Sequence, residues 1–151
     1  MKAITDPAAD EATRSDESLH DWRKRSKVLW YQLQVLENTW PGEICPFAEQ
    51  VHQLTDWLGE DHDLAVLSGL IGANGATGLP EQERDRLLDT IRRRRCDLQQ
   101  DAFELGRRIY AEKTHAFVRR IGQYWHAWSH AQIESCPAGS SPTQAEPAAI
   151  A

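Results

Sequence analysis

Apolar residues recur every three or four positions through most of this 151-residue chain, which is the period of an amphipathic α-helix. Residues 16–38 form the first such segment, and Ser15 or Ser18 can cap its start, while the Pro41-Gly42 pair prevents its continuation. The stripe that we expect to face the core is Trp22, Ser26, Leu29, Leu33 and Leu36. No convincing alternation of apolar and polar residues predicts a strand.

A second helix is expected directly after this Pro-Gly pair, with Gly59 ending it. Its inner stripe is Phe47, Val51, Leu54 and Leu58. The next residues, 59–72 (GEDHDLAVLSGLIG), are interpreted as a short separate helix that Glu60 or Asp61 caps.

Two more long helices follow a glycine-rich loop. The first begins at Pro80 and carries Leu87, Ile91, Leu98, Ala102, Leu105 and Ile109; the second covers residues 114–130 and buries Phe117, Ile121, Tyr124, Trp125 and Trp128. The predicted fold class is therefore all-α, an antiparallel helical bundle of about four long helices plus one short helix.

The excess of acidic residues lies mostly at the two ends of the chain, whose net charge is -6. The first 19 residues hold five acids and two bases, and residues 131–151 hold two acids and no base. We expect residues 1–15 and 131–151 to be disordered, because they lack a periodic apolar pattern. The nearly neutral part between these ends can still present a basic surface, since local potential depends on how charges are arranged.

Three widely spaced cysteines, Cys45, Cys96 and Cys136, fit neither a disulfide framework nor a metal-binding pair. No apolar run predicts a membrane span, and the N-terminus does not have the pattern of a signal peptide. We therefore expect a cytoplasmic protein without a membrane partner, a cofactor or a metal site.

The stretch LHDWRKRSKVLWYQL, residues 19–33, concentrates positive charge on one face of the first helix. That face, about 100° wide and separate from the core stripe, holds His20, Arg23, Lys24, Lys27 and Tyr31. We call these five residues the basic row, which is roughly 16 Å long at the helical rise. Like charges one turn apart destabilise a helix by a few tenths of a kcal/mol. An anion bound along the helix would offset this repulsion, so the basic row favours the interpretation that it is an anion-binding surface.

The alternative is a solvated charged face, for which Glu17 and Asp21 supply local partners. His20 and Tyr31 are atypical of such a face, whereas phosphoryl oxygens suit Arg, Lys, His and Tyr together. A second basic stretch, IRRRRCD from residue 91, wraps four arginines around a full turn, so we expect at least one to lie against the core with its stem buried.

The segments LHDWRKRSKVLWYQL, LTDWLGEDHDLAVL and LGRRIYAEKTHAFVRRIGQYWHAW, in this order over residues 19–130, resemble the CHAD domain, the conserved histidine α-helical domain. The resemblance implies non-catalytic binding of inorganic polyphosphate by a basic surface, often at polyphosphate granules. It assigns this role to the basic row, with His62 as an outer member and Lys113 as a further residue. Residues 16–130 would then be a CHAD-like bundle.

Two features depart from the family. Trp30 stands where members commonly have another base, and the chain has a single bundle, resembling the C-terminal one, where the family typically has two. The resemblance thus suggests a homodimer or pairing with a second CHAD-like bundle, or else a truncated remnant with weakened binding.

Three other functions compete with polyphosphate binding. The His20-Asp21 and His62-Asp63 dipeptides suggest an HD-type metal phosphohydrolase, but the neighbouring cations oppose a divalent metal. A basic helix also suits general polyanion or nucleic-acid binding, although no base-reading motif is present. The last alternative is a partner-docking bundle that binds no anion.

Overall fold

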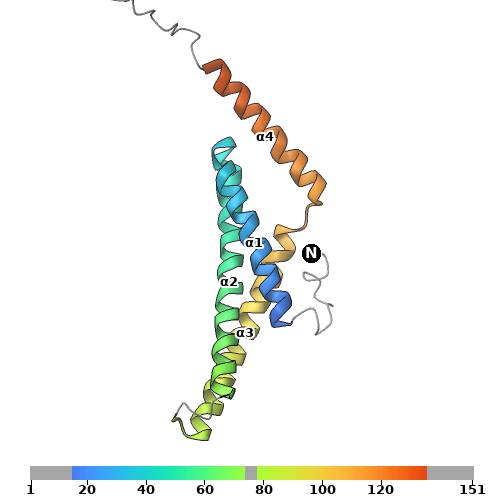
Figure 1. Ribbon diagram of the computed structural model, residues 1–151. Helices are drawn as coiled ribbons and strands as arrows, with labels where there is room; N and C mark the ends of the chain where they lie inside the picture. The colour runs from blue at the N-terminus through green and yellow to red at the C-terminus, as the bar shows by residue number, and fades with distance from the viewer. Residues whose placement is uncertain (1–14, 74–77, 136–151) are drawn as a thin grey trace, which may run out of the picture.

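The computed structural model describes residues 15–73 and 78–135. Its elements are α1 (Asp16–Leu36), the short 3-10 helix η2 (Glu37–Thr39), α2 (Pro41–Ala73), α3 (Glu81–Ile109) and α4 (Thr114–Ser135) (Figure 1). The predicted all-α fold class is confirmed, because the described residues contain helices and no strand. Most of the two ends for which we predicted disorder, and Cys136, lie outside the described residues.

Helix α1 begins as its sequence predicts. Ser15 is the N-cap, and its hydroxyl accepts a hydrogen bond of 3.2 Å from the backbone N–H of Ser18. Asp16 and Glu17 in the first turn carry the sign of charge that the helix dipole favours there. The core stripe is also confirmed, with Trp22, Ser26 and Leu33 buried and Leu29 and Leu36 partly buried.

The prediction that Gly59 ends a helix is wrong, because α2 runs without interruption from Pro41 to Ala73 and no separate short helix follows. Gly59 is buried inside α2, and a Cβ atom built there would lie 3.3 Å from Nε of Arg23. A glycine in a helix interior costs about 1 kcal/mol relative to alanine. Here its bare backbone makes room for a neighbouring side chain, so this glycine marks a close contact and not a helix end.

Asp61, which we expected to cap the short helix, instead lies buried in the interior of α2. Its carboxylate oxygen Oδ1 accepts hydrogen bonds of 2.9 Å from Arg95 Nε and of 2.9 Å from Gln99 Nε2, both on α3. Arg95 also bonds Asp16 at the start of α1. This network joins α1, α2 and α3, and it pairs a carboxylate that would be costly to bury alone.

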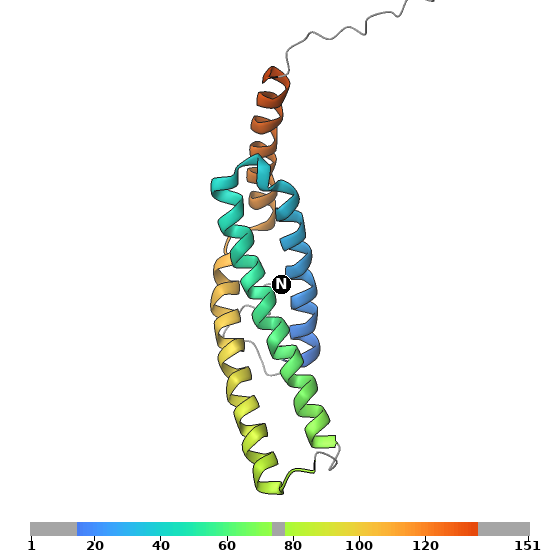
Figure 2. The ribbon, with the colours of Figure 1, turned by 90° about the vertical axis from the view of Figure 1, so that its left-hand side faces the viewer.

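The long helix α2 occupies the centre of the arrangement, packed along one part of its length on α1 and along another on α3 (Figures 1 and 2). Connections at opposite ends of α2 make it antiparallel to both neighbours. The hairpin of α2 and α3 extends past the start of α1 (Figure 1). Leu87, on the predicted apolar stripe of α3, stands in the second turn of that helix and thus toward this protruding end, and it is 38% exposed.

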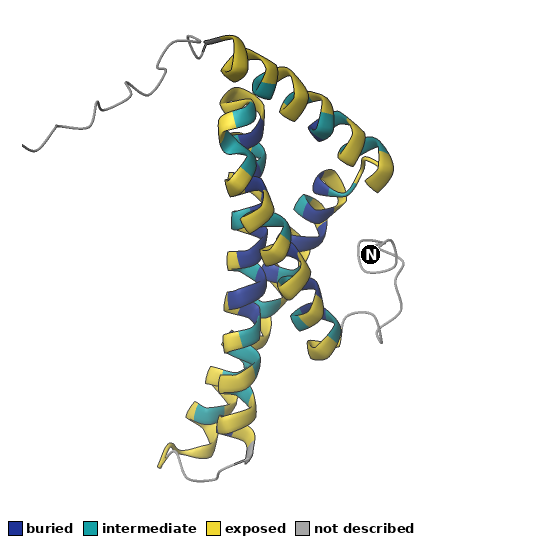
Figure 3. Ribbon diagram, turned by 45° about the horizontal axis from the view of Figure 1, so that its top comes forward, coloured by how far each residue is buried: buried dark blue, intermediate teal, exposed yellow. Residues whose placement is uncertain are grey.

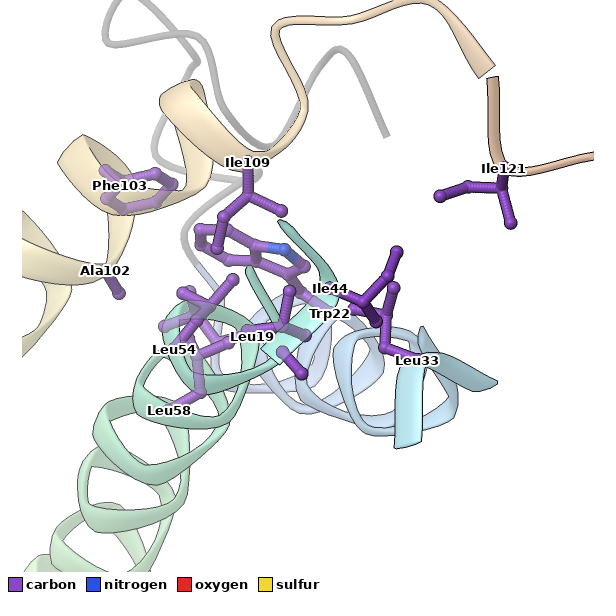
Figure 4. Packing of buried hydrophobic residues seen from close by; sticks show 12 residues of the cluster. Leu19, Trp22, Leu33, Ile44, Leu54, Leu58, Ala102, Phe103, Ile109 and Ile121 are labelled. Carbon is purple, nitrogen blue, oxygen red and sulfur yellow. The ribbon is translucent and has the colours of Figure 1, made fainter. Parts of the chain in front are cut away.

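The buried residues gather where α1, α2 and α3 meet, whereas the protruding end of the hairpin is mostly exposed (Figure 3). Trp22 is fully buried, with its ring centroid 5.4 Å from that of Phe103. Figure 4 shows Ile109 and Leu54 close to the Trp22 ring, while Ile121 of α4 lies apart. The hydroxyls of Ser26 and Tyr110 are 2.9 Å apart and link α1 to the end of α3.

Helix α4 turns away from α3 and extends back toward the connection between α1 and α2 (Figure 1). It contacts η2 and the adjacent helix ends through aromatic pairs, with ring centroids of Trp40 and Tyr124 at 4.6 Å and of Phe47 and Phe117 at 5.7 Å. Because α4 covers the bundle with only part of its surface, Trp125, which we predicted to be buried, is 44% exposed. None of the helices described has the length and apolar character that crossing a bilayer requires.

Candidate anion-binding face

The basic row lies along the side of α1 that borders α2. At its N-terminal end, the His20 ring contacts the His62 ring of α2, with centroids 4.7 Å apart and planes tilted by 31°. We call these two residues the His20–His62 pair. The sequence predicted a role for each of them, and the antiparallel packing of α1 and α2 brings them into contact.

Partial burial is the main cause that lowers the pKa of His20 below its ordinary value of 6.5. The positive charges of Lys24 and Arg23 and the neighbouring His62 ring lower this pKa further. Asp21 acts in the opposite direction. The buried Nδ1 atom of His20 has no hydrogen-bond partner, so the position favours an uncharged ring in the free protein.

One turn along the row, Arg23 lies across the bare backbone of Gly59. It lines an open pocket of about 440 Å³ between α1 and α2, whose other lining residues include Thr55, Asp56, Gly59, Glu60 and Asp63. Within residues 15–73 and 78–135, no ion pair holds the Arg23 guanidinium. Its donors are thus free for an external anion.

The α2 side of this pocket is acidic. Glu60 is occupied by Arg94, which donates two hydrogen bonds of 2.7 and 3.0 Å and lowers the pKa of the Glu60 carboxyl. An Asp56 oxygen lies 3.2 Å from Nδ1 of His52. Asp63 is exposed and takes no part in an ion pair among the residues described. These carboxylates repel an anion from α2, so the accessible path for one follows α1.

The remaining members of the basic row differ in the contacts that they make within the protein. Lys24 Nζ lies 3.4 Å from an Asp21 oxygen in an exposed pair, which is worth little in solution. Lys27 Nζ lies 5.9 Å from the centroid of the Tyr31 ring, a cation–π contact. Tyr31, which ends the row, is 50% exposed.

A second stack involving a histidine bounds the other end of the face, and sequence reasoning missed it. The Trp30 ring lies 4.2 Å from the His52 ring of α2 and 4.9 Å from the Tyr31 ring. His52 precedes His62 by ten residues, which leaves the two about 80° apart around α2, and both contact aromatic side chains of α1. That spacing was the signal available in the sequence. Where the CHAD family commonly has another base, this chain thus has an aromatic residue packed on an imidazole.

Lys113, which the resemblance also assigned to the site, lies elsewhere. It occupies the connection between α3 and α4, where its backbone carbonyl accepts hydrogen bonds from the first turn of α4. Its neighbours Glu112 and Thr114 line a pocket with Arg25, on the side of α1 that faces α3 and α4. The structure therefore brings together the basic row and His62 but not Lys113.

The four consecutive arginines of α3, which we call the α3 arginine cluster, are Arg92, Arg93, Arg94 and Arg95. All four contact carboxylates: Arg92 and Arg93 pair with Asp89, Arg94 with Glu60, and Arg95 with Asp61 and Asp16. Arg95 is 19% exposed, which confirms that one of these stems lies against the core. The cluster is thus internally neutralised.

The HD-type interpretation required histidines and carboxylates to converge on a metal. Among the residues described, no group of three or more His, Cys, Asp or Glu side chains could hold a metal ion. His20 and His62 do meet, but the other charged neighbours of His20 include Arg23 and Lys24. The donor set around this pair therefore does not fit a divalent cation.

The fold and this face define a class: an all-α protein in which a histidine-bearing basic helix packs antiparallel to a second long helix. The CHAD domain family model matches residues 1–72, just under half of the chain, and confirms the family resemblance. The matched residues include α1, η2 and nearly all of α2, whereas α3, α4 and Lys113 lie outside. CHAD domains are known in general as non-catalytic polyphosphate-binding domains. No curated protein and no solved structure matches this chain.

Proposed function

We propose that this chain binds inorganic polyphosphate non-catalytically, through the basic row on α1 together with His62. The observation that carries the proposal is the free state of Arg23 and Lys27, which have no carboxylate partner among the described residues. The α3 arginine cluster, by contrast, is fully engaged. Positive groups that the fold leaves unpaired along one line suit an extended anion with a charge on every unit.

Each side chain of the row has a distinct use for a phosphate oxygen. The planar guanidinium of Arg23 can donate two parallel hydrogen bonds, and the ammonium group of Lys27 acts as a point charge. Protonated His20 and the Tyr31 hydroxyl can each donate one hydrogen bond. The carboxylates of α2 repel an anion and leave it the side of the face that α1 forms. We therefore expect the polyphosphate chain to run parallel to the axis of α1.

A specific nucleic-acid complex has less support. Stacking of bases requires aromatic rings with an open face, but Trp30 is already packed on His52 and Tyr31. The row also offers no arrangement for reading base edges. We therefore expect nucleic acid to bind only as a non-specific polyanion, more weakly than polyphosphate at equal salt.

The test is a titration of the purified protein with long-chain polyphosphate, with orthophosphate and duplex DNA at the same phosphate and salt concentrations. The site variant is Arg23→Ala/Lys27→Ala, and the matched control is Arg92→Ala/Arg93→Ala, which also removes two positive charges but at exposed, paired positions. Charge-assisted hydrogen bonds contribute about 1.5–3 kcal/mol each, so the site variant should lose tenfold or more in affinity. The control should stay within about twofold.

Three outcomes would contradict the proposal. Equal losses in the two variants would mean that net charge and not the row governs binding. Equal affinity for DNA would make the surface a general polyanion binder. Absence of polyphosphate binding in a protein with intact helical circular dichroism would leave the row as a solvated charged face.

Pairing with a second bundle and a cytoplasmic location at polyphosphate granules stay predictions from the family resemblance. Light scattering tests the first of them, since a homodimer should give twice the mass of 17.2 kDa. A monomer at the concentrations used for the titration would contradict the homodimer without affecting the proposed site.

A further inference from the structure

The His20–His62 pair differs in kind from the lysines and arginines of the row, because an imidazole is a side chain whose charge can change in the physiological range of pH. The two rings come from different helices and contact each other at 4.7 Å. When both imidazoles carry a proton, two positive charges lie at this short separation and repel each other. The charge on the pair therefore depends on what else lies nearby.

The groups around the pair in the free protein disfavour an added proton. On α1, Lys24 and Arg23 oppose a positive charge on His20, and Asp21 favours one but is shared with Lys24. A proton on the buried Nδ1 atom of His20 would also have no acceptor.

The carboxylates of the packed helices do little to offset this. On α2, Glu60 is held by Arg94 and Asp61 by Arg95, and the free carboxylate there is the exposed Asp63 beside His62. From α3, Arg95 reaches the start of α1, where it also bonds Asp16. Among the residues described, the neighbouring acids are thus mostly engaged by arginines, and the exposed Asp63 and the Lys24-paired Asp21 are the carboxylates left to favour a proton on the pair.

We propose that anion binding at the basic row is coupled to protonation of the His20–His62 pair, so that the protein takes up a proton from the solvent as polyphosphate binds. This inference rests on the proposed function. A phosphate chain beside the pair adds negative charge to that of Asp21 and Asp63, and it offsets the repulsion from Lys24 and Arg23. By linkage, a ligand that favours the protonated pair must bind more tightly as pH falls.

The proton is taken up by the protein and not by the polyphosphate. Internal phosphates of a long polyphosphate remain ionised throughout the range in which histidine titrates, and chain ends are few. We assign the uptake to the pair and not to one ring, because the two rings are in contact. Each proton taken up changes affinity by at most about tenfold per pH unit, so the coupling gives a modest and graded response to acidity.

The experiment is isothermal titration calorimetry of the full chain with long-chain polyphosphate near neutral pH, in several buffers that differ in ionisation enthalpy. The slope of observed enthalpy against buffer enthalpy counts the protons taken up. The test variants are His20→Asn and His62→Asn, which replace each ring by a polar side chain that does not titrate. The control is His126→Asn at an exposed position on α4. Affinities are also compared between about pH 6 and pH 8.

We expect the native protein and the His126→Asn control to take up a fraction of a proton, up to about one, per bound site, and to bind more tightly at the lower pH. Each test variant should take up fewer protons on binding, and its affinity should increase much less when the pH is lowered. Uptake that is absent in the native protein, or unchanged in both test variants, would overturn the coupling. Such a result leaves the proposed function intact if polyphosphate still binds, whereas absence of binding at every pH contradicts the proposed function itself.

Discussion

The basic row on α1 and the α3 arginine cluster are both rich in positive charge, but they differ in how their cations are paired. The basic row on α1 leaves Arg23 and Lys27 without carboxylate partners in the part of the chain that the structure describes, and the face beside α2 stays open. The α3 arginine cluster is occupied by carboxylates from three helices. Arg94 and Arg95 of the second stretch hold helices together, whereas the unpaired cations of the first are available to a ligand. The proposed site therefore rests on which cations are unpaired, and not on how many cations are consecutive in the sequence.

The largest effect on stability should come from Asp61 of α2, the buried carboxylate that pairs with Arg95 of the α3 arginine cluster. Asp61→Ala removes the main partner of Arg95, whose side chain is 19% exposed. Breaking a buried pair in this way leaves a poorly solvated charge, so we expect a loss of about 3 kcal/mol in the free energy of unfolding. Urea denaturation followed by circular dichroism measures it.

Asp89→Ala is the control, since this residue pairs with two exposed arginines of the same cluster. Its loss should be under about 1 kcal/mol. Similar losses in the two variants would show that Asp61 is no more important than a surface carboxylate, and the structural role given to the cluster would then be wrong.

A smaller effect should separate two glycines of α2. Gly69→Ala meets no atom within 4 Å and should stabilise the protein by about 1 kcal/mol through helix propensity, with polyphosphate affinity unchanged. Gly59→Ala places a methyl group 3.3 Å from Arg23 Nε, so it should gain less stability and weaken polyphosphate binding severalfold. Urea denaturation and the polyphosphate titration measure the two quantities. Equal behaviour of both variants would contradict the contact between Arg23 and α2.

The smallest effect concerns pH. The pKa of His20 is lower in the folded protein than its ordinary value of 6.5, so between these two values the unfolded chain binds more protons. The free energy of unfolding should therefore rise with pH through this window and level off above it. His20→Asn should remove that part of the rise, whereas His130→Asn, at an exposed position on α4, should retain it. Urea midpoints across the window measure the difference, and parallel profiles for all three proteins would contradict it.

Local periodicity predicted most of the fold. The core stripes of α1 and α2 and the cap at Ser15 follow from spacing and residue type alone. Gly59 was misassigned because a glycine in a helical pattern has the same local signature whether it ends the helix or receives a neighbouring side chain. Its long-range partner, Arg23, decides between the two.

The candidate site was predictable on one helix and not on the other. The spacing of the basic row fixed its members on a common face, but the contacts with α2 depend on how two helices align. His62 was carried by a family resemblance, whereas the Trp30–His52 stack and the acidic lining at Asp56 needed the packed structure. The family resemblance also assigned Lys113 to the site. This residue lies outside residues 1–72, which the family model matches, and the structure places it away from the basic row.

Helix α4 differs from the other three in how it is held. The network of Asp16, Asp61 and Arg95 ties α1, α2 and α3 together, while α4 contacts η2 and nearby helix ends through a few aromatic rings. Opening α4 therefore breaks few contacts, whereas opening any of the first three helices disrupts the shared core. In amide hydrogen exchange, we therefore expect α1, α2 and α3 to open as one cooperative unit, and α4 to open separately with lower protection.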